Sequence, residues 1–320
     1  MAKQAVLLLA HGTPETVEQI PEYLRNVVSG RPLPEAVIEE IQHRYSLIGR
    51  SPLTEITLEQ GRLVEGDLAA QGIKVPVYVG MRNWRPYIPD VVRQMQADGV
   101  EEAAVICLAP QNSRTSVGLY RRAVQAEAGA LRIEFTEGWA EHPLLAEAFA
   151  ERLRAALLKI KAETGALAPV LFTAHSVPLR TVQAPAAGEG QPRLWPGEGA
   201  DPYELEAKRT AELVAQRVPE IPRWWFAFQS QGASGGPWIG PTVESMLDSI
   251  AAEGVKTLVL QPIGFLCDHV EILYDVDIAF RQHAEKLGIR LARPESLNSS
   301  PMLAKAVADL ARQGLAKLKA

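Results

Sequence analysis

The sequence predicts an α/β protein built from two similar halves with parallel sheets. Eight short apolar runs alternate along the 320 residues with longer amphipathic stretches, and this alternation is typical of βαβ units whose sheets are covered by helices on both faces. A second observation is internal repetition. Two segments, VLLLAHGTPE at 6–15 and VLFTAHSVPL at 170–179, each place a histidine and a proline directly after an apolar run.

The apolar runs give the predicted strands, at 5–10, 75–80, 103–109, 131–135, 169–174, 224–229, 256–261 and 289–292. Prolines mark predicted helix starts, because their fixed φ suits the first helical turn. We expect one helix to open at Pro14, a long one to run from Pro143 to about Thr164, and the last to open at Pro301. The last helix has apolar residues at helical spacing, at Leu303, Val307, Leu310 and Leu315.

The repetition extends beyond the histidine segments. Residues 80–110 and 230–262 both contain a strand end, a loop with Trp and Pro, a helix, a Gly and a second strand that ends in Pro. This correspondence pairs Pro89 with Pro241, Gly99 with Gly254 and Pro110 with Pro262. We therefore predict an N-terminal α/β domain at 1–142, a C-terminal one at 143–300, and a C-terminal helix at 301–320 that packs back on the first domain. A stretch rich in Pro, Gly and Ala at 184–202 is predicted to be a surface loop.

The composition narrows the class of protein. A net charge of −5 gives no broad basic surface for nucleic acid or acidic lipid. Two cysteines, Cys107 and Cys267, lie in separate apolar runs, which favours buried free thiols over a disulfide scaffold or a four-cysteine metal site. The N-terminal apolar run is too short for a signal peptide, and no stretch reaches the roughly 18 apolar residues of a membrane span. We expect a cytoplasmic protein.

The two histidines are candidates for a functional site. In open parallel sheets the ligand crevice lies beyond the carboxyl ends of the strands, and His11 and His175 both follow predicted strands. A single histidine in such a place is more often structural, but the second copy favours function. If the two halves face one another, both imidazoles look into one cleft.

A second candidate is the acidic stretch GFLCDHVEILYDVD at 264–277. In a helix, Asp268, Glu271 and Asp275 are spaced i, i+3 and i+7 and share one face. They could form a solvated acidic face near a helix start, where the helix dipole favours negative charge. Alternatively, they lead a divalent cation toward His175. Mixed imidazole and carboxylate ligands suit Fe(II), Mn(II), Co(II) or Zn(II), and the spacing does not choose among these ions.

No other common catalytic signature fits the sequence. The glycine-rich QSQGASGG at 229–236 is neither a dinucleotide fingerprint nor a phosphate loop. Ser176 directly follows His175, which is not the geometry of a Ser–His pair and argues against an acyl-transfer hydrolase.

Seven stretches together resemble the ferrochelatase family, in order and approximate spacing, over nearly the whole chain: LLLAHGTPE, RYSLIGRSPLTEIT, VGMRNWRPYIPD, AHSVP, DPYELEAKRTAELVA, FQSQGASGGPWIGPTVE and GFLCDHVEILYD. The resemblance implies two Rossmann-like domains, each with a four-stranded parallel sheet, around a porphyrin cleft. It also implies insertion of Fe(II) into a porphyrin with release of two protons. Iron is then a substrate, and neither a prosthetic group nor an iron–sulfur cluster is expected. The chain is most similar to compact bacterial enzymes that make coproheme from coproporphyrin III, and we expect a monomer.

The resemblance assigns roles to individual residues. His175 is the expected proton acceptor, Glu271 its acidic partner and Asp275 the next carboxylate. His175, Glu271 and His11 are the expected metal ligands. The expected porphyrin contacts are His11, Arg44, Tyr45, Ser51 and Tyr120, although Arg44 and Tyr45 could simply end a helix at 34–46.

The sequence also departs from the family pattern. His11 stands where relatives often have Tyr or Met. A histidine at this place makes the segment resemble the cobalt chelatases that act on sirohydrochlorin. Ala279 stands where a third acidic residue is expected. Three alternatives remain open: a protoporphyrin IX ferrochelatase, a cobalt and sirohydrochlorin chelatase, and a haem-binding protein without catalysis.

Overall fold

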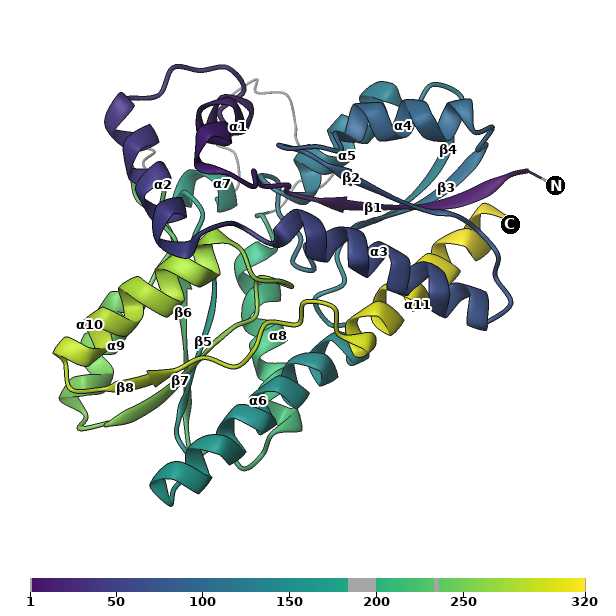
Figure 1. Ribbon diagram of the computed structural model, residues 1–320. Coiled ribbons are helices and arrows are strands. Elements are labelled where there is room, and N and C mark those ends of the chain that lie inside the picture. The colour runs from purple at the N-terminus through teal and green to yellow at the C-terminus, as the bar shows by residue number, and fades with distance from the viewer. Residues whose placement is uncertain (1, 184–199, 233–235, 320) are drawn as a thin grey trace. The chain divides into compact units, whose positions relative to one another are not determined.

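The structure is a computed structural model that describes residues 2–183, 200–232 and 236–319. The chain divides into two compact units. The described part of unit 1 covers residues 2–139 and 298–319, and that of unit 2 covers 140–183, 200–232 and 236–297. Residues 184–199 of the predicted surface loop 184–202 lie outside the described residues. Each unit contains one four-stranded parallel sheet flanked by helices (Figure 1), which confirms the predicted fold class.

The sheet of unit 1 has the strand order β2-β1-β3-β4. Its strands are β1 (Gln4–Ala10), β2 (Val77–Met81), β3 (Glu102–Cys107) and β4 (Arg132–Thr136). Helices α3 (Leu53–Ala70) and α11 (Pro301–Leu318) pack together on one face, while α4 (Ile88–Ala97) and α5 (Val117–Glu127) pack on the other (Figure 1). The unit also contains the 3-10 turn η1 (Val17–Gln19), α1 (Ile20–Val27) and α2 (Glu35–Ile48).

Alternation along β1 explains why both faces are covered. Leu7 and Leu9 pack in the apolar core formed with α4 and α5, and the intervening Val6 and Leu8 are equally buried because successive strand residues point to opposite faces. On the second face α11 approaches β3 closely. A Cβ atom at Gly314 would lie 2.9 Å from the Cβ of Ala104, so the glycine permits this contact.

The sheet of unit 2 has the order β6-β5-β7-β8, with strands β5 (Val170–His175), β6 (Trp224–Gln229), β7 (Thr257–Pro262) and β8 (Arg290–Ala292). Helices α6 (Pro143–Thr164) and α8 (Tyr203–Arg217) pack against each other. A separate apolar core joins the sheet to α9 (Val243–Ala252), α10 (Arg281–Lys286) and the π-helix η2 (Glu271–Phe280). The short helix α7 (Leu179–Val182) follows β5. The β5 strand is thus central in its sheet, as β1 is in the other.

The two sheets repeat the same arrangement, but two of the three predicted residue pairs of the repeat were wrong by three residues. Ala10 pairs with Met81 in unit 1, and Ala174 pairs with Phe228 in unit 2, so His11 and His175 follow equivalent strand positions. Met81 N donates to the carbonyl of Pro86, and Phe228 N donates to that of Pro241. Pro86, not Pro89, therefore corresponds to Pro241.

The same correspondence makes Pro262, which ends β7, equivalent to Cys107, which ends β3, rather than to Pro110. Gly99 and Gly254 are equivalent as predicted, and both have a positive φ, of 76° and 84°. The error arises because the loop that follows β6 is longer than the loop that follows β2, so the Trp and Pro residues of the two loops do not align.

The prediction that Pro14 opens a helix is also wrong. Residues 11–16 form a loop, and the helical region begins with η1. Gln19 Oε1 accepts hydrogen bonds from the backbone N–H groups of Glu15 and Thr16, at 2.9 and 3.2 Å, which fixes the start at this later position. The helices predicted to begin at Pro143 and Pro301 are α6 and α11, so those predictions are confirmed.

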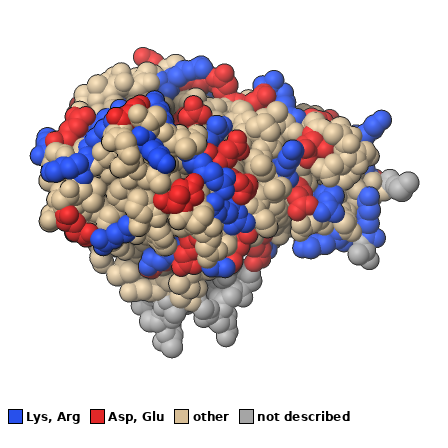
Figure 2. Space-filling model, turned by 90° about the horizontal axis from the view of Figure 1, so that it is seen from below, with Lys and Arg blue, Asp and Glu red and all other residues tan. Residues whose placement is uncertain are grey.

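Both cysteines are buried free thiols, as predicted, and burial is the main cause that raises the pKa of Cys267 to about 12. Within the described ranges we find no helix with the length and apolar character needed to cross a membrane. Basic and acidic side chains intermingle on the face drawn in Figure 2, as the small net charge leads one to expect.

Candidate functional site

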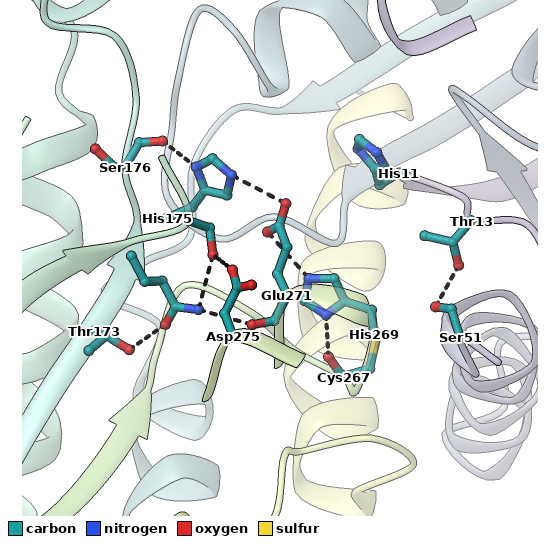
Figure 3. A network of polar contacts seen from close by, with 12 residues as sticks. His11, Thr13, Ser51, Thr173, His175, Ser176, Cys267, His269, Glu271 and Asp275 are labelled. Carbon is teal, nitrogen blue, oxygen red and sulfur yellow. Dashed lines mark hydrogen bonds and ion pairs between the residues drawn. The ribbon is translucent and has the colours of Figure 1, made fainter. Parts of the chain in front are cut away.

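His175 is the last residue of β5, and its imidazole meets an acidic side chain. Nε2 lies 3.4 Å from Glu271 Oε1, and Nδ1 is hydrogen-bonded to the backbone carbonyl of Ser176 (Figure 3). A carbonyl oxygen can only accept a hydrogen bond, so Nδ1 carries the proton. In the neutral ring, Nε2 therefore presents a lone pair toward Glu271, and a proton taken up there is shared with the carboxylate.

Glu271, the first residue of the π-helix η2, lies between two imidazoles. Its Oε1 faces His175, and its Oε2 lies 3.6 Å from Nε2 of His269 (Figure 3). The His269 ring is nearly buried, with its Nδ1 3.0 Å from the carbonyl oxygen of Cys267 and its ring centroid 4.5 Å from that of Phe265. The carboxylate is thus held on both sides, while 33% of the Glu271 side chain remains exposed.

The charges of this pair shift both pKa values. Burial acts to lower the pKa of His175, but the charge and hydrogen bond of Glu271, with smaller contributions from Ser176 and Asp275, give a net rise. Burial acts to raise the pKa of Glu271, but His175 and then His269 bring it well below its usual value. The structure therefore favours an ionised Glu271 beside an imidazole that binds protons readily.

A buried network that the sequence did not reveal supports the next carboxylate, Asp275. Thr173 Oγ1 donates to Gln229 Oε1 at 2.6 Å, and Gln229 Nε2 lies 3.3 Å from the backbone carbonyl of Glu271 and 3.4 Å from Ser230 Oγ. The Ser230 hydroxyl donates to Asp275 Oδ2 (Figure 3). Thr173 and Gln229 are 0% and 1% exposed, so this network links the ends of two strands to the first turn of η2.

The predicted stripe of three carboxylates is wrong for Asp268. This residue precedes η2, and its carboxylate binds Arg293 at 3.2 Å and accepts a hydrogen bond from Ser296 at 2.7 Å. Arg293 is distant in sequence, so spacing within the acidic stretch could not reveal the ion pair. Over the described part of the chain, no group of three or more His, Cys, Asp or Glu side chains is arranged to hold a metal ion.

In unit 1, His11 directly follows β1, and its partners include two neutral polar side chains. His11 Nε2 lies 2.8 Å from the Tyr23 hydroxyl and 3.1 Å from Asn83 Nδ2. Two residues beyond His11, Thr13 Oγ1 donates to Ser51 Oγ at 2.8 Å, and both of these side chains are buried (Figure 3). Tyr23 was not predicted as part of the site, since no local sequence pattern connects it to residue 11.

The remaining predicted contacts, Arg44, Tyr45 and Tyr120, lie on helices of unit 1. Arg44 forms a 2.9 Å ion pair with Glu40 within α2 and is 31% exposed, whereas Tyr45 is fully buried. Tyr120 is 4% exposed, belongs to the apolar core beneath α5, and lies 5.4 Å from the Arg82 guanidinium. Burial raises the pKa of Tyr120. Arg44 is the most accessible of the three.

Comparison with known proteins identifies the family. The family model described as Ferrochelatase matches residues 3–315. The chain belongs to the ferrochelatase family. A ferrochelatase of Acidobacterium capsulatum is 62% identical over 99% of this chain and 96% of its own length. A coproporphyrin III ferrochelatase of Mycolicibacterium vanbaalenii is 34% identical over 97% of this chain and 89% of its own length.

Among solved structures, the sirohydrochlorin chelatase SirB from Bacillus subtilis subspecies spizizenii, in complex with cobalt, has a TM-score of 0.55 at 13% identity. The match covers 98% of this chain and 95% of that one, and it supports the fold. Ferrochelatases are lyases that insert metal into a porphyrin, and this is the enzyme class of the chain.

Proposed function

We propose that this ferrochelatase inserts Fe(II) into coproporphyrin III, with His175 as the proton acceptor. The observation that carries the proposal is the 3.4 Å contact between His175 Nε2 and Glu271 Oε1 at the carboxyl end of β5. Metal insertion replaces two pyrrole protons, and a base is needed to remove them. The hydrogen bond from Nδ1 to Ser176 leaves Nε2 as the accepting atom.

Glu271 would assist proton transfer through its charge. As Nε2 takes a proton, the ring becomes cationic, and the ionised carboxylate beside it stabilises that cation. Burial disfavours a charged imidazole, which is why the neighbouring anion is needed. His269, on the other side of Glu271, keeps the carboxylate turned toward this position.

The same carboxylates suit the second substrate, ferrous iron. Fe(II) accepts mixed imidazole and carboxylate ligands, and an anionic group offsets part of the cost of removing the ion from water. We propose His175 and Glu271 as transient ligands, Asp275 as a nearby anion held by Ser230, and His11 as an imidazole ligand from unit 1. The proposal includes no resident prosthetic group, because iron and porphyrin are both consumed.

Two facts favour coproporphyrin III. Coproporphyrin III ferrochelatases of Mycolicibacterium vanbaalenii and a Geobacillus species align with 97% and 96% of this chain. The four propionates of this porphyrin need several cationic or hydroxyl partners, and Arg44 in unit 1 is a cationic side chain that is 31% exposed.

An anaerobic assay tests both parts of the proposal. Purified enzyme is mixed with Fe(II) and either coproporphyrin III or protoporphyrin IX, and the loss of free-porphyrin absorbance is followed. We expect a higher kcat/KM with coproporphyrin III. His175→Ala should remain folded and lose about 10²–10⁴-fold in kcat. Faster turnover of protoporphyrin IX would refute the substrate assignment, and full activity of His175→Ala would refute the base.

His283→Ala is the matched control. His283 lies in α10 with Nε2 2.9 Å from Asp248 Oδ1, so it forms the same kind of pair at an unrelated place. Its activity should equal that of the unaltered enzyme.

A second candidate is a chelatase for another metal and tetrapyrrole. It rests on His11, whose imidazole directly follows β1. A parallel assay with Co(II) and sirohydrochlorin separates the two functions. A protein that binds haem tightly but inserts neither metal would instead be a haem carrier.

A further inference from the structure

Arg293, directly after β8, makes polar contacts with four other residues, and no function has yet been assigned to it. Its Nε and Nη2 donate to the two carboxylate oxygens of Asp277 at 2.8 and 2.7 Å, and its Nη1 contacts Asp268 Oδ1 at 3.2 Å. The same Nη1 lies 3.1 Å from Ser296 Oγ and 3.2 Å from the Pro294 carbonyl. Only 13% of the side chain is exposed, so the guanidinium is largely withdrawn from water.

The two carboxylates bound by Arg293 flank the acidic residues of the candidate site. Asp268 precedes η2, Asp277 lies within it, and Glu271 and Asp275 fall between them. One side chain from another element therefore fixes both ends of the segment that presents these acids. The contact to Asp277 uses two parallel hydrogen bonds, a geometry that fixes orientation as well as distance.

A π-helix needs such external support. Its backbone is rare, it occurs frequently at functional sites, and it persists only where the surroundings hold it. Ile272, Val276 and Phe280 anchor the apolar side of η2 in the core. Apolar contacts are non-directional, so they hold η2 against the sheet without setting the rotation of its acidic residues. The hydrogen bonds of Arg293 are directional, so they can fix the rotation of η2 and with it the direction of its acidic side chains.

We propose that Arg293 is a positioning residue for metal insertion: it holds segment 268–277 so that Glu271 Oε1 faces His175 Nε2. The inference rests on the role proposed for the His175 and Glu271 pair. Arg293 contacts neither of these residues in any interaction described above, and its effect passes through Asp268, Asp277 and the backbone between them.

The test compares Arg293→Met, Arg293→Lys and the control Arg281→Met. Arg281 also contacts Asp277, at 3.5 Å, but its side chain is 47% exposed. The control therefore removes a cation from the same carboxylate while the contacts of Arg293 with Asp268 and Asp277 stay in place. We expect Arg293→Met to lose about 10–100-fold in kcat, the usual effect of removing a group that orients a ligand, with little change in KM for the porphyrin. Arg293→Lys should lose less kcat than Arg293→Met, because the lysine ammonium keeps the positive charge but cannot form the two parallel hydrogen bonds to Asp277.

Hydrogen exchange of the backbone amides at 268–280 provides an independent readout. Arg293→Met should exchange faster there than the unaltered enzyme, and Arg281→Met should not. Unchanged exchange and unchanged kcat in Arg293→Met would overturn the proposal, as would equal losses in the two methionine variants. If exchange rises in Arg293→Met but Glu271→Gln keeps full activity, Arg293 does hold segment 268–277, and the role proposed for Glu271 is refuted.

Discussion

Replacing Glu271 by Gln should change stability in a pH-dependent way. Unit charges 3.4 Å apart attract by about 5 kcal/mol at an effective dielectric constant of about 20. His175 and Glu271 are 32% and 33% exposed, and screening by water reduces the measurable coupling to about 1 kcal/mol. In a domain of this size, that corresponds to a fall in Tm of about 2–4 °C.

The sign of the pH dependence follows from the two pKa shifts. The pKa of His175 is raised in the folded protein, so its contribution is complete below the usual value of about 6.5 and is lost as pH rises through the folded value. The pKa of Glu271 is lowered, so its contribution is present above about 4.5 and is lost as pH falls through its folded value. The coupling is therefore largest between about pH 4.5 and 6.5.

Thermal melts of the unaltered enzyme and Glu271→Gln at pH 6 and pH 9 measure this difference. We expect destabilisation at pH 6 that disappears by pH 9. The acid limb of kcat/KM, which should lie above pH 6.5 in the unaltered enzyme, should move to lower pH in the variant, because the anion that raises the pKa of His175 is gone. Equal destabilisation at both pH values would show that the charge of the pair is not the cause.

Four further substitutions test the local structure. Thr173→Val removes the hydroxyl that donates to buried Gln229 and should lower the free energy of unfolding, measured with urea, by about 1–3 kcal/mol. Thr173→Ser should recover most of this stability. An unchanged free energy of unfolding in Thr173→Val would show that the network does not stabilise the fold. Gly264→Ala places a Cβ 3.0 Å from that of Ala174, beside His175. It should lower the free energy of unfolding by about 1–3 kcal/mol and should also lower the activity. Its control, Gly66→Ala in α3, meets open space and should be stabilising by up to about 1 kcal/mol; a destabilised control would contradict the steric account.

Most of the fold was predictable because its signals are local. Each strand is an apolar run bounded by polar residues, and Pro143 and Pro301 mark the starts of α6 and α11 correctly. Pro14 misled the prediction because proline is equally suited to the loop that η1 follows. The π-helix was not predicted, since Ile272, Val276 and Phe280 recur at spacings that also suit an ordinary helix.

The site was predictable only in part. Strand ends and acidic residues led to His175 and Glu271, and the structure places them in contact, while their chemical roles remain proposals. Asp268 was misinterpreted because its partner, Arg293, lies in the loop after β8 and is distant in sequence. Thr173 and Gln229 gave no signal, since each stands in an apolar run that predicts only a strand. Contacts between elements distant in sequence thus account for what was missed.

His11 and His175 occupy equivalent backbone positions but have different chemical surroundings. One strand end carries an imidazole next to the carboxylate of Glu271, and the equivalent strand end carries an imidazole whose partners include Tyr23 and Asn83. Either ring can therefore be retuned by exchanging its neighbours while the main chain stays as it is. Different neighbours at one of these strand ends would change the proton affinity of its imidazole without any change of backbone.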